Sequence, residues 1–235
     1  MTAPLRIVIF GLTLSSSWGN GHATTYRALI RALADRGHEI LFFEREQPWY
    51  ADHRDLDQPS YCRLEFYRDL RSLDGLAARI EAADATIVGS YVPDGIQVGR
   101  FAQRHARLAV FYDIDTPVTL ARVAREDCDY LSAALIPGYD LYLSFTGGPI
   151  LTRLERDYGS PAARALYCSV DSDAYKPTAA HPAFDLGYLG TYSEDRQPAL
   201  ERFLIEPARR RPDLKFIVAG AQFPPHLAWP DNVAR

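Results

Sequence analysis

The sequence predicts an α/β protein built on a doubly wound, Rossmann-like parallel sheet. Two observations carry this expectation. Short apolar runs rich in β-branched or aromatic residues recur along the chain, and several end at glycine or aspartate, as the run at 5–10 ends at Gly11. Stretches with the apolar spacing of helices alternate with these runs. Strands that alternate with helices form parallel sheets with right-handed crossovers.

The expected elements follow in chain order. Strands are expected at 5–10, 40–43, 64–67, 86–88, 108–112, 140–145, 186–189 and 214–219. Helices are expected from near His22 to just before Gly37, at 73–83, 96–105 and 149–158, and from 198 past 204 with an interruption at Pro207.

The segment 171–182 holds two prolines and few apolar anchors, which is typical of a linker. We therefore expect a first domain at 1–172, a linker at 173–183 and a second α/β domain at 184–235. The second domain is expected to be incomplete, because about two strands are fewer than an open sheet usually has. A partner chain or a dimer would then cover it.

The composition limits the classes of function. The chain has 235 residues, and its apolar and charged fractions of 47% and 24% are those of a globular protein. A net charge of −4 argues against a general nucleic-acid partner. Cys62, Cys128 and Cys168 lack metal or redox spacing, and the apolar start is too short for a membrane span. We expect a cytoplasmic protein without a transmembrane segment.

A loop of small residues at 15–22 joins the first expected strand to its helix. Gly19, Asn20 and Gly21 let the backbone approach a ligand, and the helix start offers N–H groups to a phosphate or carboxylate. His22 at that start is a candidate base or hydrogen-bond donor. A tight turn that needs glycine for geometry alone, with His22 as a helix cap, explains the same residues.

A dinucleotide site is a weaker interpretation of this region. Glu44 ends the second expected strand, roughly where a ribose-binding acid would lie. However, Thr24 stands in place of the third glycine, and the loop at 11–21 is too long for the tight first turn. The fingerprint is therefore not met.

Two carboxylates follow the strand expected at 108–112. Asp113 and Asp115 flank a single residue, a spacing that suits a divalent cation or provides one general base. Alternatively, Asp115 or Thr116 caps the helix that Pro117 starts. That explanation is weaker for Asp113, which must project from the end of the strand.

Thr146, Gly147 and Gly148 form a further loop between a strand and a helix, and it suits an anion, a hydroxyl group or plain turn geometry. The segment 167–171 is expected to be the last strand of the first domain with its turn, or to line a cleft between domains.

A small-residue loop follows the first strand of the second unit. Gly190 and Thr191, with Arg196 nearby, suit a diphosphate, because arginine forms forked and charge-assisted hydrogen bonds. A solvated arginine before a helix is the simpler explanation.

Taken together, these segments resemble glycosyltransferases of the two-Rossmann-domain (GT-B) fold, and most of all the bacterial CgeB-like, spore-maturation type. The matching stretches keep their order over nearly the whole chain: FGLTLSSSWGNGHATTYRALIRAL, RGHEI, VGSYVPDG, FYDIDTPVTL, DLYLSFTGGP, LYCSVD and LGYLGTYSEDRQPALE. RGHEI is weak by itself, whereas the longer stretches together are fairly specific.

The resemblance implies transfer of a sugar from a UDP-, GDP- or dTDP-sugar to an acceptor, which is a glycan, a protein or a small molecule. It implies an acceptor-binding first domain, a donor-binding second domain and no bound metal. Asp113, Asp115 and His22 are then candidates for the base. The loop at 19–21 would lie beside the diphosphate or the acceptor, and Arg196 would hold the donor's diphosphate.

Members of this family continue with further strands, so the resemblance implies that the sequence is truncated in its second domain and inactive alone. Two hypotheses remain. One is a glycosyltransferase or its acceptor-side portion, and the other is a non-catalytic α/β module, derived from such an enzyme, that binds a small molecule or a protein.

Overall fold

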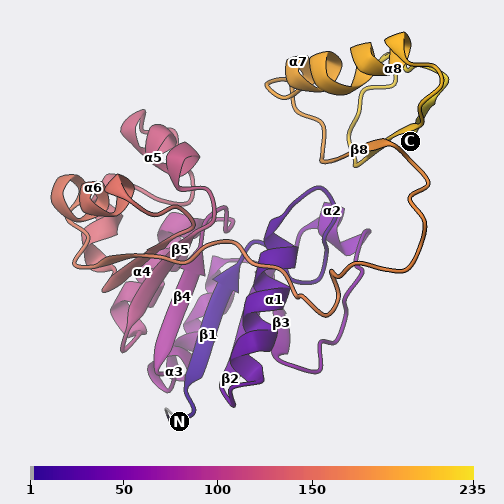
Figure 1. Cartoon of the computed structure of the whole chain (residues 1–235). Helices are drawn as coiled ribbons and strands as arrows, with labels where there is room; N and C mark the ends of the chain where they lie inside the picture. The colour runs from indigo at the N-terminus through magenta and orange to yellow at the C-terminus, as the bar shows by residue number, and fades with distance from the viewer. Residues whose placement is uncertain (1–2) are drawn as a thin grey trace. The chain divides into compact units, whose positions relative to one another are not determined.

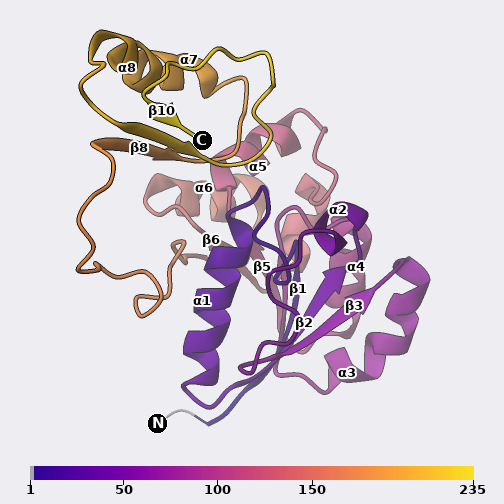
Figure 2. The same ribbon diagram turned by 90° about the vertical axis from the view of Figure 1, so that its right-hand side faces the viewer.

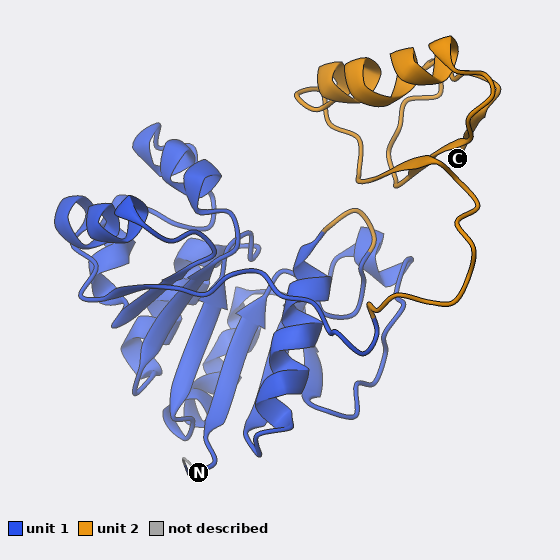
Figure 3. Ribbon diagram, in the orientation of Figure 1, with its two compact units in different colours: residues 1–17, 21–174 blue, residues 18–20, 175–235 orange. Residues whose placement is uncertain are grey.

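The computed structural model describes residues 3–235, which form two compact units (Figures 1 and 3). The first unit contains the residues up to Ser17 together with Gly21–Ala174, and the second contains Trp18–Asn20 and Tyr175–Arg235. The first expected domain begins at residue 1, and residues 1 and 2 lie outside the described part.

The first unit is built on one parallel sheet, as the alternating pattern predicts. Its strands are β1 (Arg6–Gly11), β2 (Glu39–Arg45), β3 (Arg63–Tyr67), β4 (Ala85–Gly89), β5 (Ala109–Asp113), β6 (Leu141–Ser144) and β7 (Ala163–Ala165). They are arranged in the order β3-β2-β1-β4-β5-β6-β7, and every neighbouring pair is parallel. This order is that of a Rossmann-like, doubly wound sheet. Successive strands are added toward one edge from β1 to β3 and toward the other edge from β4 onward, so the strand order reverses between β1 and β4.

Helices cover both faces of this sheet. They are α1 (His22–Ala34), α2 (Pro48–Ala51), α3 (Ala77–Glu81), α4 (Gly95–His105), α5 (Thr116–Ala124) and α6 (Pro149–Tyr158), with 3₁₀ turns η1 (Leu70–Leu76) and η2 (Ala133–Gly138). Figure 2 shows α1 on one side of the sheet and α3 with α4 on the other. The apolar residues of the strands alternate between these two faces, as they must in a sheet buried on both sides.

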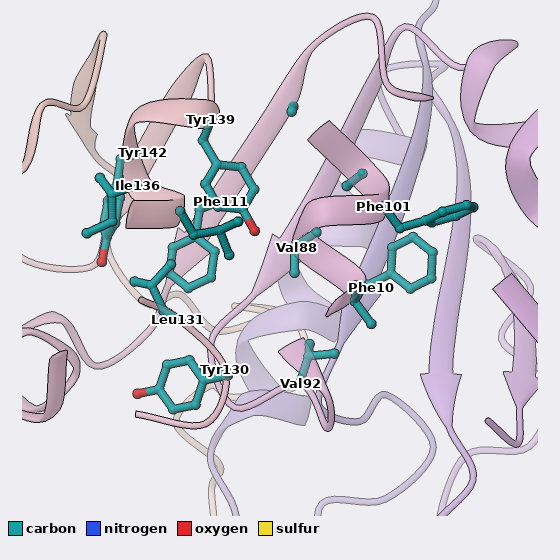
Figure 4. Packing of buried hydrophobic residues seen from close by; sticks show 14 of the residues in the cluster. Phe10, Val88, Val92, Phe101, Phe111, Tyr130, Leu131, Ile136, Tyr139 and Tyr142 are labelled. Carbon is teal, nitrogen blue, oxygen red and sulfur yellow. The ribbon is translucent and has the colours of Figure 1, made fainter. Parts of the chain in front are cut away.

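Two hydrophobic cores result from this arrangement. Val8 and Phe10 of β1 point into a core with α3, α4, α5 and α6, while Ile7 and Ile9 point into a core with α1. In the larger core, Phe111 packs between two tyrosines, with ring centroids 5.3 Å from Tyr139 and 5.2 Å from Tyr142 (Figure 4). The close packing of Phe111 therefore fixes the end of β5, and the candidate aspartates stand at and just after that end.

The second unit contains a smaller parallel sheet, in the order β10-β9-β8, with β8 (Leu186–Leu189), β9 (Phe216–Ala219) and β10 (Val233–Ala234). One helical run follows β8 through α7 (Gln197–Leu200), a π turn η3 (Glu201–Ile205) and α8 (Glu206–Arg210). Its apolar side packs on β9 around Leu204, Ile205 and Phe216.

The structure corrects three sequence-based expectations. The last strand of the first unit is Ala163–Ala165, and the segment 167–171 expected to form it is not in a strand. The helix expected at 73–83 is a 3₁₀ turn followed by a short α-helix. Pro207 does not interrupt the helix, because the π turn before it bonds Glu206 N–H to the carbonyl of Glu201 and leaves the proline at a helix start.

Candidate functional site

The candidate site lies where the strand order of the first unit reverses. In open α/β sheets, ligands bind beyond the carboxyl ends of the strands at this switch point. Here β1 ends at Gly11, β4 at Gly89 and the neighbouring β5 at Asp113. The loops that follow these three strands lead to His22, Tyr91 and Asp115, respectively.

His22 is the first residue of α1, the helix that follows β1. The residue is partly exposed, but its Nδ1 atom is buried without a hydrogen-bond partner. Burial lowers the pKa of His22 to about 4, so the imidazole is neutral near pH 7. Buried polar atoms are normally paired, so this unpaired nitrogen requires an explanation, such as a role in binding or catalysis or a bound water. The structure does not support His22 as the helix cap, because Gly21 occupies that position.

Gly21 has no conformational need to be glycine. Its φ of −94° suits any residue, and a Cβ added to it would have no neighbour within 4 Å. The space over this backbone is therefore open at the start of a thirteen-residue helix. Such a place admits the close approach of a ligand to the main chain.

Tyr91 lies between His22 and Asp115, and sequence reasoning missed it. It follows β4 by two residues, with a left-handed φ of 62° that is uncommon outside glycine. Its ring lies edge-on to the His22 imidazole at 5.3 Å, and its hydroxyl donates to Asp115 Oδ2 at 2.8 Å. Burial, with the neighbouring Asp115 carboxylate, raises the pKa of Tyr91 to about 12. The other candidates were selected because they follow the ends of strands, and the same criterion could have selected Tyr91.

Asp113 and Asp115 have different environments. Asp113 is fully buried and accepts hydrogen bonds from Tyr142 Oη at 2.5 Å, Thr119 Oγ1 at 2.8 Å and the Asp115 N–H at 3.0 Å. Burial raises the pKa of Asp113 although these donors oppose it. Asp115 is half-buried, and its side chain does not cap α5. Asp113 therefore shapes the turn, and Asp115 is the carboxylate that faces Tyr91.

The loop at 146–148 is tied to the same turn. Ser144 Oγ at the end of β6 lies 2.8 Å from Thr116 Oγ1 and 3.1 Å from Thr146 Oγ1. Gly148 needs glycine for its φ of 73°, and a Cβ on Gly147 would meet the hydroxyl of Tyr167 at 2.5 Å. Turn geometry thus accounts for Gly148, whereas Gly147 is only in close contact with the exposed side chain of Tyr167.

Glu44 does not serve as a ribose-binding acid. Its carboxylate is 1% exposed and accepts hydrogen bonds from the loop after β1. The dinucleotide interpretation therefore loses its acidic partner as well as its third glycine.

The remaining candidates belong to the second unit. Gly19, with φ 68°, and Asn20 are grouped there, while His22 and the aspartates belong to the first unit. After β8, the Gly190 N–H donates to the carbonyl of Ala219 at 2.9 Å, and Thr191 is the next residue. The backbone of Gly220 passes so close that a Cβ there would lie 2.0 Å from the Gly190 oxygen.

Arg196, the last of these candidates, precedes α7 and is exposed. Its exposure leaves the interpretation as a solvated arginine open.

Two cavities of the first unit lie outside this constellation. One of about 330 Å³ is lined by the amino ends of β1 and β2, including Arg6 and Glu39, so it is at the opposite end of the sheet. Another of about 590 Å³ lies between α4, α5, α6 and η2, with Cys128 in its wall. Among residues 3–235, no three His, Cys, Asp or Glu side chains are placed to hold a metal ion, and no helix is long and apolar enough to cross a membrane.

No family model and no curated protein matches this sequence. Solved structures do match the fold. An α-glucosyltransferase in complex with UDP-glucose and DNA is 12% identical with a TM-score of 0.65, over 95% of this chain and 59% of that one. The catalytic domain of starch synthase IV from Arabidopsis thaliana, bound to ADP and acarbose, is 11% identical with a TM-score of 0.59, over 95% and 70%. A glycosyltransferase from Rickettsia africae is 11% identical with a TM-score of 0.51, over 93% and 61%.

At these identities the likeness shows the fold alone. The chain has the Rossmann-like α/β architecture of GT-B glycosyltransferases, and it spans about three-fifths of the length of the α-glucosyltransferase. The expectation that the chain has no nucleic-acid partner gains no support from the comparison, because the α-glucosyltransferase complexes contain DNA.

Proposed function

We propose that this chain is the acceptor-side portion, with the start of the donor side, of a glycosyltransferase that moves a sugar from a nucleotide-sugar to an acceptor hydroxyl. The observation that carries the proposal is the constellation of His22, Tyr91 and Asp115 at the switch point, with Nδ1 of His22 unpaired. The fold of the matching glycosyltransferases supports it. On the sequence stretches that resemble CgeB-like enzymes, we also propose that the glycosyltransferase is of the CgeB-like type. Its expected location is the cytoplasm.

The proposed base is His22, with Asp115 as the second candidate. A neutral imidazole can take the proton of an acceptor hydroxyl as that oxygen attacks the donor sugar. Asp113 is unsuited to this role, because its oxygens already accept three hydrogen bonds inside the protein. Tyr91 would hold Asp115 and the edge of the imidazole in place, so that the two candidates face one acceptor.

The second unit would contribute to the donor. In this proposal the turn at Gly190 and Thr191 lies beside the diphosphate, and Arg196 neutralises its charge as the nucleotide leaves. The donor is a UDP-, GDP- or dTDP-sugar, and the ADP in the starch synthase complex adds ADP-sugars to the panel to be tested.

The test is a calorimetric titration of the purified chain with these nucleotide-sugars, followed by candidate acceptors in the presence of the donor that binds. We expect acceptor affinity to fall at least about tenfold in His22→Gln and Asp115→Asn. His181→Gln is the matched control, because His181 is exposed in the linker. Acceptor binding that is equal in all four proteins would contradict the placement of the site, and the absence of binding by every donor and every acceptor would contradict the function.

Metal independence is a separate prediction. Asp113 is enclosed by its donors, so the Asp113–Asp115 pair cannot present two carboxylates to one cation without opening the turn. We expect donor binding to be unchanged by EDTA. Loss of binding in EDTA with recovery in Mn²⁺ would instead assign the aspartates a metal-binding role.

A further inference from the structure

Glu44 lies at the end of β2, and the loop after β1 closes on its carboxylate. Oε2 accepts the N–H groups of Leu14 at 2.7 Å and Ser15 at 2.9 Å. Oε1 accepts the hydroxyls of Ser15 at 2.6 Å and Thr13 at 3.1 Å. The carboxylate is 1% exposed, so these four donors take the place of its hydration.

The same loop is also tied to α1. Arg27 Nε of that helix donates to the carbonyl of Leu14 at 2.9 Å, and the Leu14 side chain is fully buried in the core that contains Tyr26 and Ile30. On its outer side, the carbonyl of Ser15 accepts two backbone N–H groups at 3.0 Å from the segment after α2. The loop therefore joins the end of β2 to the helix whose first residue is His22.

We propose that Glu44 is a positioning residue: its carboxylate fixes Leu14 and Ser15 against α1 and thereby holds His22 and Gly21 at the switch point. The loop carries no regular secondary structure between Leu12 and Gly21, so its shape depends on side-chain acceptors of this kind. The inference rests on the proposed function only in naming His22 and Gly21 as parts of the site.

The test compares three variants by amide hydrogen exchange and by NMR titration of the His22 imidazole. Glu44→Leu removes every acceptor, so exchange at Leu14 and Ser15 should accelerate at least about tenfold. The pKa of His22 should move from about 4 toward the ordinary 6.5 as the imidazole becomes hydrated. Glu44→Gln should restore both readouts, because its oxygen can accept the two N–H groups and the hydroxyls can turn to accept its NH₂.

The matched control is Asp84→Asn. Asp84 accepts the Arg6 N–H at 2.8 Å at the opposite end of the sheet, so its loss should leave both readouts unchanged. A folded Glu44→Leu protein with wild-type exchange and wild-type His22 pKa would overturn the proposal. If that variant does not fold, hydrogen exchange in the unmodified protein provides the test. Protected amides at Leu14 and Ser15 support their hydrogen bonds to Glu44, and unprotected amides overturn the proposal. Neither readout uses a donor or an acceptor, so a failure here is distinct from a failure of the proposed sugar transfer.

Discussion

His22 is the residue whose protonation state decides the proposed chemistry. Its folded pKa of about 4 lies below the ordinary value of 6.5, so the unfolded chain binds a proton over a pH range in which the folded protein does not. The stabilisation from keeping His22 neutral is therefore present above pH 6.5 and is lost as the pH falls toward 4.

We expect NMR titration to show His22 neutral at pH 6. The free energy of unfolding should decline between pH 6.5 and 4 more steeply in the wild type than in His22→Gln, which has no such proton to bind. Parallel profiles for the two proteins, or a His22 titration near pH 6.5, would contradict the buried imidazole.

Asp113 allows a second test at this scale. Because its folded pKa is raised, its contribution to stability is present at low pH and is lost as the pH rises through the folded pKa. Asp113→Asn can keep all three hydrogen bonds, since Tyr142 Oη can accept from the amide. Asp113→Leu leaves the Tyr142 hydroxyl and the Asp115 N–H without their acceptor, while Thr119 keeps Tyr130 as a partner at 2.8 Å.

We therefore expect denaturant unfolding at pH 7 to show a loss of more than about 2 kcal/mol in Asp113→Leu and a loss below about 1 kcal/mol in Asp113→Asn. The stability of Asp113→Asn relative to the wild type should also increase with pH. The opposite trend would mean that Asp113 is held ionised by its neighbours.

At the scale of elements, α1 packs very closely on β4, through Tyr26 and Gly89. A Cβ on Gly89 would lie 1.9 Å from the hydroxyl of Tyr26, and that hydroxyl is buried without a partner. Gly89→Ala should cost about 1–3 kcal/mol by overpacking, while Tyr26→Phe should be close to neutral.

A double-mutant cycle tests the close packing of Tyr26 on Gly89. Removing the hydroxyl opens the space that the new methyl group needs, so Tyr26→Phe/Gly89→Ala should recover most of the loss in Gly89→Ala. Additive losses measured by urea unfolding would show that the glycine is needed for another reason.

The elements also show what the sequence could predict. Apolar runs such as 5–10 and 108–112 predicted the central strands, because a strand buried on both faces needs a continuous apolar run. The position of Tyr91 beyond a strand end could have been noticed, but its hydrogen bond to Asp115 could not be predicted, because it depends on a left-handed backbone and joins residues 24 apart. Glu44 was placed correctly at a strand end, but its donors lie 29–31 residues earlier in the chain, where spacing gives no signal.

For the whole molecule, the two units differ in the size of their cores. Two extensive clusters fill the first unit, whereas the second has a single small cluster around Leu200, Leu204 and Phe216. Small cores leave little margin of stability. We expect amides of β8–β10 to exchange faster than those of β1, β4 and β5, and uniform protection across both sheets would contradict this expectation.

The proposed function places an acceptor at the switch point of the first unit. The most direct measurement is NMR mapping of the labelled chain. A nucleotide-sugar that binds is added first, and acceptors are then titrated in. We expect acceptors to shift the signals of Gly21, the His22 imidazole and Tyr91. Shifts confined to the cavity beside Cys128, with those three signals unmoved, would contradict it.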